Sequence, residues 1–282
     1  MGFVDSIRSN LTPSSMLNEI RLLLSVPQNK YKTIVLVEGQ NDIKLLVSLV
    51  NMQNTYLIES FSGKSAILET MTSRFKDEKR VIGIIDRDYD NTLPNKVFTY
   101  DFCNLEMMVI SDDDSFNYTM FQITNSSYGN LAIRKQSLEK LFILSVIRKL
   151  NDEYDWGICF ERFPIYDYFK NNNYLSLDWV VRVLNVKNSN NITEEKLNTI
   201  KQELKNQNKM ELLKITNGHD FCKMLLHELK VAYSSMSKVA SINVNELELF
   251  LIMGYNLNCF KKTQLFKDIN DYQSRNSLKF IS

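Results

Sequence analysis

The sequence is poor in residues that bind zinc. Its four cysteines, Cys103, Cys159, Cys222 and Cys259, lie far apart, no Cys-x-x-Cys pair occurs, and there are only two histidines. Zinc-binding domains need such ligands at short, fixed spacings, so a zinc finger or zinc ribbon is excluded. Cysteines without a pairing pattern are typical of a reducing cytosol, and they predict a cytoplasmic protein with buried free thiols.

Long apolar runs and an excess of charge of one sign are also missing. No stretch approaches the roughly eighteen apolar residues that span a bilayer, and the N-terminus lacks a signal-peptide pattern. The sequence therefore predicts no membrane partner. The formal net charge is +1, so the chain as a whole lacks a broad positive field, and we expect any nucleic-acid contact to be local.

The composition is that of an ordinary globular protein. Of the 282 residues, 44% are hydrophobic and 24% are charged, which excludes a disordered or fibrous chain. This length predicts one large domain, or a core domain with a smaller appendage.

In the first hundred residues, short apolar runs alternate with segments whose apolar residues recur at helical spacing. This order predicts an α/β fold with a mostly parallel sheet flanked by helices. The predicted strands are Thr33 to Val37, Thr55 to Ile58, Val81 to Ile85 and Lys96 to Tyr100, and the helices between them are Asn41 to Val50 and Ser65 to Phe75.

The rest of the chain is predicted to be mainly helical. We expect an N-terminal helix in residues 1–30, with Thr12 as N-cap and Pro13 as first helical residue, to pack on a core of residues 31–111. Residues 112–282 should complete the fold and form partner or dimer surfaces. The predicted helices there are Gln136 to Leu150, Leu177 to Leu184, Glu194 to Asn206, Asp220 to Ser235 and Asn245 to Met253.

Glu38 is the first candidate site residue. It directly follows the predicted strand Thr33 to Val37, a glycine comes next, and Asn41 or Asp42 can cap the following helix. Open α/β sheets bind ligands outside the carboxyl ends of their strands, so a carboxylate at this position faces a site. The alternative is that Glu38 only begins a loop.

A pair of aspartates follows the second buried strand. Asp86 and Asp88 come directly after Val81 to Ile85, and residues i and i+2 of an extended chain point to the same side. Two carboxylates held together repel each other, and a hard cation such as Mg²⁺ relieves that repulsion. The alternative is an acidic turn; Asp90 is either a third ligand or part of that turn.

These segments together resemble the Toprim domain shared by topoisomerases, bacterial primases, small ribonucleases and overcoming-lysogenization-defect nucleases. The resemblance covers about Thr33 to Val109, and Gly63-Lys64-Ser65 lies where the family has a glycine-containing turn. This triplet is not a P-loop, because Ile58 stands where a Walker A motif needs glycine. The resemblance implies that Glu38 is a general acid/base or metal ligand. It also implies that Asp86 and Asp88 bind Mg²⁺, with Mn²⁺ as the alternative ion.

Two further segments resemble AriB-type Toprim effectors of PARIS anti-phage systems. They are Cys103-Asn104-Leu105-Glu106, after the last predicted strand, and Asn217-Gly218-His219-Asp220, at the start of a late helix. The resemblance implies that Glu106 is an extra metal ligand and that His219 contacts phosphate, although relatives often have lysine there. The alternative for His219 is a helix-start residue satisfied by hydrogen bonds. Proteins of this kind are partnered by an ABC-type ATPase, here expected to be AriA-like.

The resulting prediction is a Mg²⁺-dependent nuclease, a toxic defence effector that an ABC-type ATPase restrains and that acts as a homodimer. The chain is too short for a topoisomerase or a primase. We expect tRNA as substrate, with Lys64, Arg134, Lys135 and His219 as candidate contacts; the alternative for the basic segment 132–150 is a solvated helix face. Surplus apolar faces in 225–231 and 247–252 predict the dimer or partner surface. The alternative functions are a non-catalytic Toprim-fold subunit of an ATPase complex and a DNA nuclease of the overcoming-lysogenization-defect type.

Overall fold

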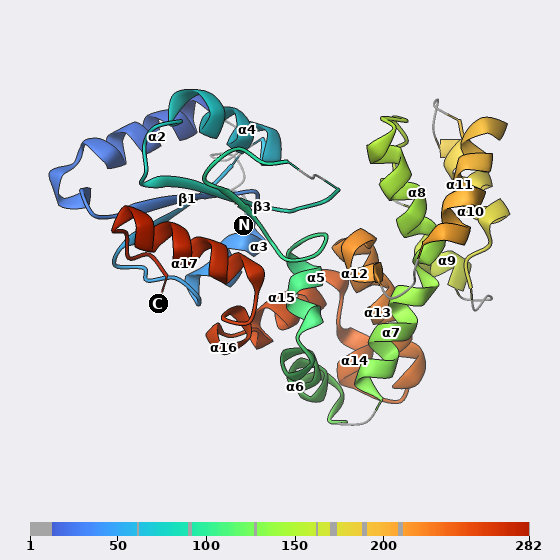
Figure 1. Cartoon of the computed structure of the whole chain (residues 1–282). Coiled ribbons are helices and arrows are strands. Elements are labelled where there is room, and N and C mark those ends of the chain that lie inside the picture. Colours follow the sequence, from blue (N-terminus) through green and yellow to red (C-terminus); the bar gives the residue numbers. More distant parts are fainter. Residues whose placement is uncertain are drawn as a thin grey trace. The chain divides into compact units, whose positions relative to one another are not determined.

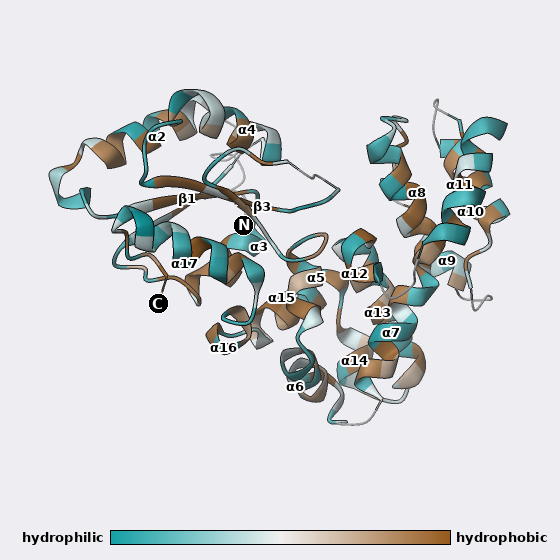
Figure 2. Ribbon diagram, in the orientation of Figure 1, coloured by the Kyte–Doolittle hydropathy of each residue, from teal (hydrophilic) through white to brown (hydrophobic). Residues whose placement is uncertain are grey.

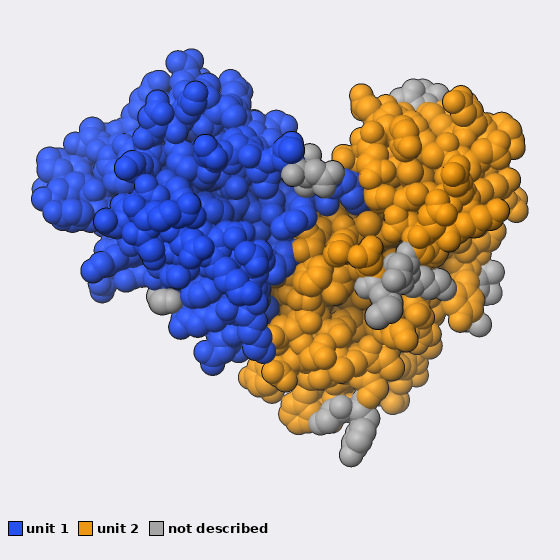
Figure 3. Space-filling view, viewed as in Figure 1, with its two compact units in different colours: residues 1–101, 255–282 blue, residues 102–254 orange. Residues whose placement is uncertain are grey.

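The computed structural model divides the chain into two compact units (Figure 3). Unit 1 comprises Met1–Asp101 and Tyr255–Ser282, and unit 2 comprises Phe102–Gly254. The predicted N-cap Thr12 and the predicted third acid Asp90 lie outside the described residues. The structure describes residues 13–60, 62–89, 92–126, 129–161, 163–169, 174–187, 191–207 and 211–281.

A four-stranded parallel sheet forms the centre of unit 1, with strand order β2-β1-β3-β4. Every residue of the two central strands β1 and β3 is buried, and Figure 2 shows both as strongly hydrophobic. Burial on both faces explains why these strands are continuous apolar runs. The predicted α/β class is therefore confirmed. The strands are β1 (Thr33–Val37), β2 (Thr55–Glu59), β3 (Val81–Ile85) and β4 (Val97–Thr99).

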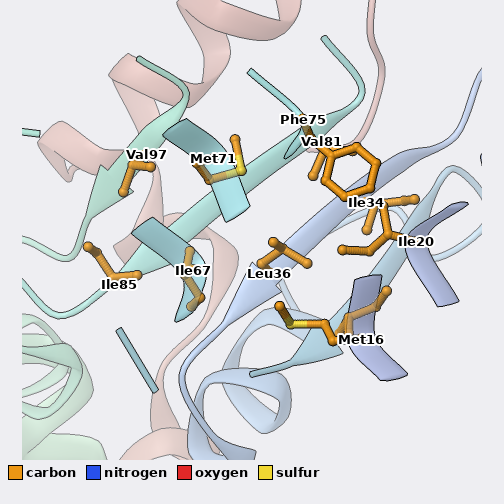
Figure 4. Packing of buried hydrophobic residues seen from close by; sticks show 11 residues of the cluster. Met16, Ile20, Ile34, Leu36, Ile67, Met71, Phe75, Val81, Ile85 and Val97 are labelled. Carbon is orange, nitrogen blue, oxygen red and sulfur yellow. The ribbon is translucent and has the colours of Figure 1, made fainter. Parts of the chain in front are cut away.

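Helices cover both faces of this sheet (Figure 1). On one face lie α2 (Pro13–Ser25), α4 (Gly63–Glu69) and the π-helical turn η2 (Thr70–Arg74), and on the other lie α3 (Gln40–Val47) and α17 (Gln264–Asn276). The first face packs around a buried apolar cluster (Figure 4). The labelled members of this cluster are Met16, Ile20, Ile34, Leu36, Ile67, Met71, Phe75, Val81, Ile85 and Val97.

The C-terminal segment returns to the sheet of unit 1. The Asp101 carboxylate accepts hydrogen bonds from the backbone N–H groups of Gln264 and Leu265, each at 2.9 Å, and so caps α17. Tyr272 on α17 packs edge-on against Phe98 of β4, with ring centroids 5.6 Å apart. Residues 255–282 were expected to belong to the helical region 112–282. The structure instead divides the chain at residues 101 and 254, because these long-range contacts hold the C-terminus on the sheet.

Unit 2 is helical in its described residues, and α13 lies at its core. Phe221, Cys222, Met224 and Leu225 of this helix have no exposed surface. The helices of the unit are α5 (Leu105–Ser111), α6 (Asp113–Thr124), α7 (Asn130–Lys140), α8 (Phe142–Glu153), α9 (Ile165–Phe169), α10 (Leu177–Lys187), α11 (Glu194–Asn206), α12 (Leu212–Ile215), α13 (Gly218–Ala232), α14 (Ser237–Ser241) and α15 (Val244–Gly254). The remaining described helices, both in unit 1, are η1 (Pro27–Asn29) and α16 (Leu257–Phe260).

One predicted helix is wrong. The expected helix Gln136 to Leu150 is two helices, α7 and α8, that meet at the fully buried Leu141. The sequence there contains neither proline nor glycine, so helical periodicity continues through the break. Leu141 is fully buried at the break, and the local pattern carries no sign of it.

The cysteines differ in part from the expectation of buried thiols. Cys103, Cys222 and Cys259 are buried, whereas Cys159 is exposed. None of the helices in the described ranges is long and apolar enough to cross a membrane.

Candidate functional site

The carboxyl ends of the two central strands meet at one edge of the sheet in unit 1. Glu38 follows β1 and Asp86 follows β3, and a Glu38 carboxylate oxygen, Oε1, accepts a hydrogen bond from the backbone N–H of Asp86 at 2.7 Å. Because β1 and β3 are parallel neighbours, this bond joins two residues 48 positions apart in sequence. The structure therefore brings together the first two predicted site residues.

The Glu38 carboxyl lies in an environment that disfavours its charge. Burial is the largest effect and raises its pKa, and the negative charges of Asp88 and Asp42 raise it further. The hydrogen bond from Asp86 and the charge of Lys64 act in the opposite direction without cancelling the rise. Burial, more than the neighbouring charges, therefore makes the ionised form of Glu38 less favourable than it is in water.

Asp42 belongs to this group, although the sequence suggested only a helix cap. Its two carboxylate oxygens accept hydrogen bonds from the Gly39 N–H at 2.8 Å and from the Tyr100 hydroxyl at 2.7 Å. Asp42 is 7% exposed and Tyr100 is fully buried, and burial raises the pKa of Asp42 while both hydrogen bonds lower it. These bonds tie the turn between Glu38 and α3 to the end of β4. The spacing of Asp42 three residues after Gly39, typical of a capping box, was the available signal.

Asp88 reaches the site by a different route from the one predicted. The chain leaves β3 at Ile85, and Asp88 has a φ of 51°, in the left-handed region. The alternation of an extended chain therefore does not apply to Asp86 and Asp88. The Asp88 carboxylate instead forms an ion pair with Lys64, whose Nζ lies 2.7 Å from Oδ2.

The donor chemistry of this edge fits Mg²⁺. Carboxylate oxygens are the protein ligands that Mg²⁺ prefers, and it needs only one or two of them because it keeps several waters. Among the described residues, which exclude Asp90, no set of three or more His, Cys, Asp or Glu side chains is arranged to hold a metal ion. One or two of the carboxylates of Glu38, Asp86 and Asp88 could hold a hydrated Mg²⁺, but the described residues form no complete protein cage.

The two predicted site residues of unit 2 have structural partners there. A methyl group added to Gly218 would lie 2.3 Å from a Glu106 carboxylate oxygen, so Glu106 packs against the first residue of α13. His219, half exposed, has its Nδ1 2.8 Å from the Glu248 carboxylate on α15. The Cys222 thiol is fully buried, and burial together with the charges of Glu106 and Glu248 raises its pKa. Glu248 carried no recognisable signal in the sequence.

The basic segment 132–150 is largely neutralised within unit 2. Arg134 pairs with Asp113 at 2.7 Å and also donates to the Ile110 carbonyl. Three later cations also pair within the unit: Lys140 with Glu228, Arg148 with Asp220 and Lys149 with Glu203, at 2.7, 2.7 and 2.6 Å. Lys135 is exposed on α7. The segment therefore presents much less positive charge than its sequence suggests.

These features define an acidic strand-end site in unit 1 and a set of paired charges in unit 2. In sequence comparisons, no protein-family model matches this chain and no curated protein matches it.

Proposed function

We propose that this protein is a Mg²⁺-dependent nuclease of the Toprim type, with Glu38, Asp86 and Asp88 at its active site. The hydrogen bond between Glu38 and the Asp86 N–H is the observation that carries the proposal. It joins Glu38 and Asp86 at the carboxyl edge of a parallel sheet, where such folds bind their ligands, and this supports the proposal.

The acidic residues divide two tasks in this proposal, proton transfer and metal binding. Bound Mg²⁺ would neutralise charge on the phosphodiester and activate a water. Glu38 accepts or returns a proton, and its raised pKa suits that task because a base works best when its pKa approaches the working pH. Asp86 and Asp88 supply the ion's oxygen ligands. Asp42 and Tyr100 hold the Glu38 turn in place.

The proposed substrate and the proposed restraint by a partner protein follow from the resemblance to AriB-type effectors. We propose that the chain cleaves tRNA as a homodimer and that an AriA-like ABC-type ATPase restrains it. A near-neutral chain suits a folded RNA met by local contacts better than long duplex DNA. The pairing of Arg134 with Asp113 reduces the support from the basic segment. Glu106 as an extra ligand and His219 as a phosphate contact remain parts of this proposal.

The ion pair between Lys64 and Asp88 favours a second candidate, a non-catalytic subunit of an ATPase complex. With Asp88 already neutralised, the acidic edge could serve as a structural feature without metal. Cleavage activity separates the two candidates.

The deciding experiment is a cleavage assay with the purified chain on a mixture of total RNA and supercoiled plasmid, with Mg²⁺, Mn²⁺ or EDTA. We expect divalent-dependent cleavage, with tRNA cut first. Nicked plasmid beside intact tRNA would favour the DNA nuclease instead. If both substrates stay intact with either ion, the non-catalytic subunit becomes the better proposal.

Divalent ions are also expected to stabilise the folded chain. An ion that binds only the folded state adds about 2.7 kcal/mol at a concentration one hundred times its Kd. Thermal unfolding with increasing Mg²⁺ measures this shift, and Asp88→Asn should remove most of it. Asp77→Asn, at an exposed position of unit 1, is the matched control and should keep the full shift. A melting temperature that ignores millimolar Mg²⁺ and Mn²⁺ would contradict the metal assignment.

A further inference from the structure

Lys64 is a cation that contacts the acidic strand-end site. Its ammonium lies 2.7 Å from the Asp88 carboxylate and 3.3 Å from the Arg87 carbonyl oxygen. The Lys64 side chain is 18% exposed and that of Asp88 is 43% exposed, so the ion pair stands at the surface of the site. The positive charge also acts on Glu38, where it offsets a small part of the rise in pKa that burial causes.

The position of Lys64 puts it in competition with any cation that binds Asp88. Gly63, with a φ of 62°, forms the turn that directs the start of α4, and with it Lys64, toward the strand ends. Two cations within a few ångströms of one carboxylate repel each other. The lysine stem is flexible, so its ammonium can move away while the backbone of α4 stays in place.

We propose that Lys64 changes partner on divalent-ion binding: its ammonium leaves Asp88 and binds a phosphate oxygen of the nucleic acid. This inference rests on the proposed function and adds to it that metal binding and nucleic-acid binding are coupled through Lys64. Without the metal ion, Lys64 keeps Asp88 neutralised and contributes nothing to substrate binding. With the ion, the same side chain becomes a phosphate contact, so the site binds nucleic acid tightly only when it is loaded.

Lys64→Met tests the partner exchange because it should strengthen Mg²⁺ binding and weaken nucleic-acid binding. Without the competing ammonium, the apparent Kd for Mg²⁺ should fall about fivefold. A thermal-unfolding titration of the otherwise native chain, without nucleic acid, measures this change. Lys44→Met removes the same charge from an exposed position on α3 and should leave the Kd unchanged.

Nucleic-acid binding should weaken in the same variant. With Mg²⁺ present, and with Glu38→Gln in both chains to prevent cleavage, Lys64→Met should raise the Kd for tRNA about five- to tenfold. The slope of log K against log salt should become shallower by about one, the signature of one lost phosphate contact. In EDTA the two chains should bind tRNA equally, because Lys64 is then held by Asp88.

The outcomes separate this inference from the function on which it rests. Equal Mg²⁺ affinity in Lys64→Met and the native chain would overturn the partner exchange, even if both bind the ion. Equal loss of tRNA affinity with and without Mg²⁺ would overturn it too, because Lys64 would then be a permanent contact. Absence of Mg²⁺ binding by the native chain would instead contradict the proposed function itself.

Discussion

Glu38→Gln is expected to reduce divalent-dependent cleavage by about 10²- to 10⁴-fold, the range contributed by one positioned acid or base. Glutamine keeps the shape and can still accept the hydrogen bond that Glu38 accepts from the Asp86 N–H. It cannot take up a proton, so the change removes the chemistry and leaves the local structure. Single-turnover cleavage of tRNA with saturating Mg²⁺ measures the effect.

Glu69→Gln is the matched control for this prediction. Glu69 is an exposed glutamate at the end of α4, in the same unit, and its substitution should leave the rate within about twofold. Circular dichroism and thermal unfolding establish that both variants fold. Native-like cleavage by Glu38→Gln would remove Glu38 from the active site.

Glu38→Gln should also stabilise the folded chain in EDTA at neutral pH. The folded state raises the pKa of Glu38 above its ordinary value of 4.5, so the folded chain binds this proton more tightly than the unfolded chain. The free energy of unfolding therefore falls as the pH rises from 4.5 through the raised value, and glutamine escapes that loss. Melting curves should show Glu38→Gln as the more stable chain at about pH 7, and the difference should vanish well below pH 4.5, where Glu38 is protonated in both states.

Lys140→Met should destabilise the chain by about 3–5 kcal/mol, the usual cost of breaking a buried ion pair. The Lys140 ammonium lies 2.7 Å from a Glu228 carboxylate oxygen, and both side chains are only 9% exposed. Methionine fills a similar volume but leaves the Glu228 carboxylate buried without its cation. Equilibrium unfolding by urea, followed by circular dichroism, measures the loss.

Two further variants test whether the unpaired, buried Glu228 carboxylate causes the loss of stability in Lys140→Met. Lys149→Met breaks pairs with Glu203 and Glu153, whose side chains are 21% and 40% exposed, and each of these more exposed pairs should contribute about 1 kcal/mol or less. Replacing Lys140 and Glu228 together by methionine should restore most of the stability, because no buried charge then remains. A loss as small for Lys140→Met as for Lys149→Met would show that the Glu228 carboxylate finds solvent or another partner.

Local patterns predicted the parts of the fold that depend on neighbours in sequence. The bounds of β1 and β3 match the predicted strands because both are five-residue apolar runs that end at polar residues. Glu38 and Asp86 were found for the same reason, since each directly follows such a run. Parallel pairing then made their meeting at one edge a geometric consequence.

Contacts between distant residues escaped prediction. Asp101 caps a helix 163 positions later, and Lys140 pairs with Glu228 over 88 positions. No periodicity signals such partners, so the return of the C-terminus and the neutralised basic segment were both missed. Asp42 had a local signal in its capping-box spacing, but its bond to Tyr100, 58 positions away, required the folded sheet.

By itself, the sequence determined that this chain builds a parallel sheet with acidic residues at its carboxyl edge, because strand runs and strand ends are local properties. Only the tertiary structure decided how those acids are charged and paired. The left-handed turn at Asp88, its ion pair with Lys64 and the burial of Glu38 arise where separate segments meet. Electrostatic energies depend on the distances between charges and on the exclusion of water from them, and both are set only when the chain folds.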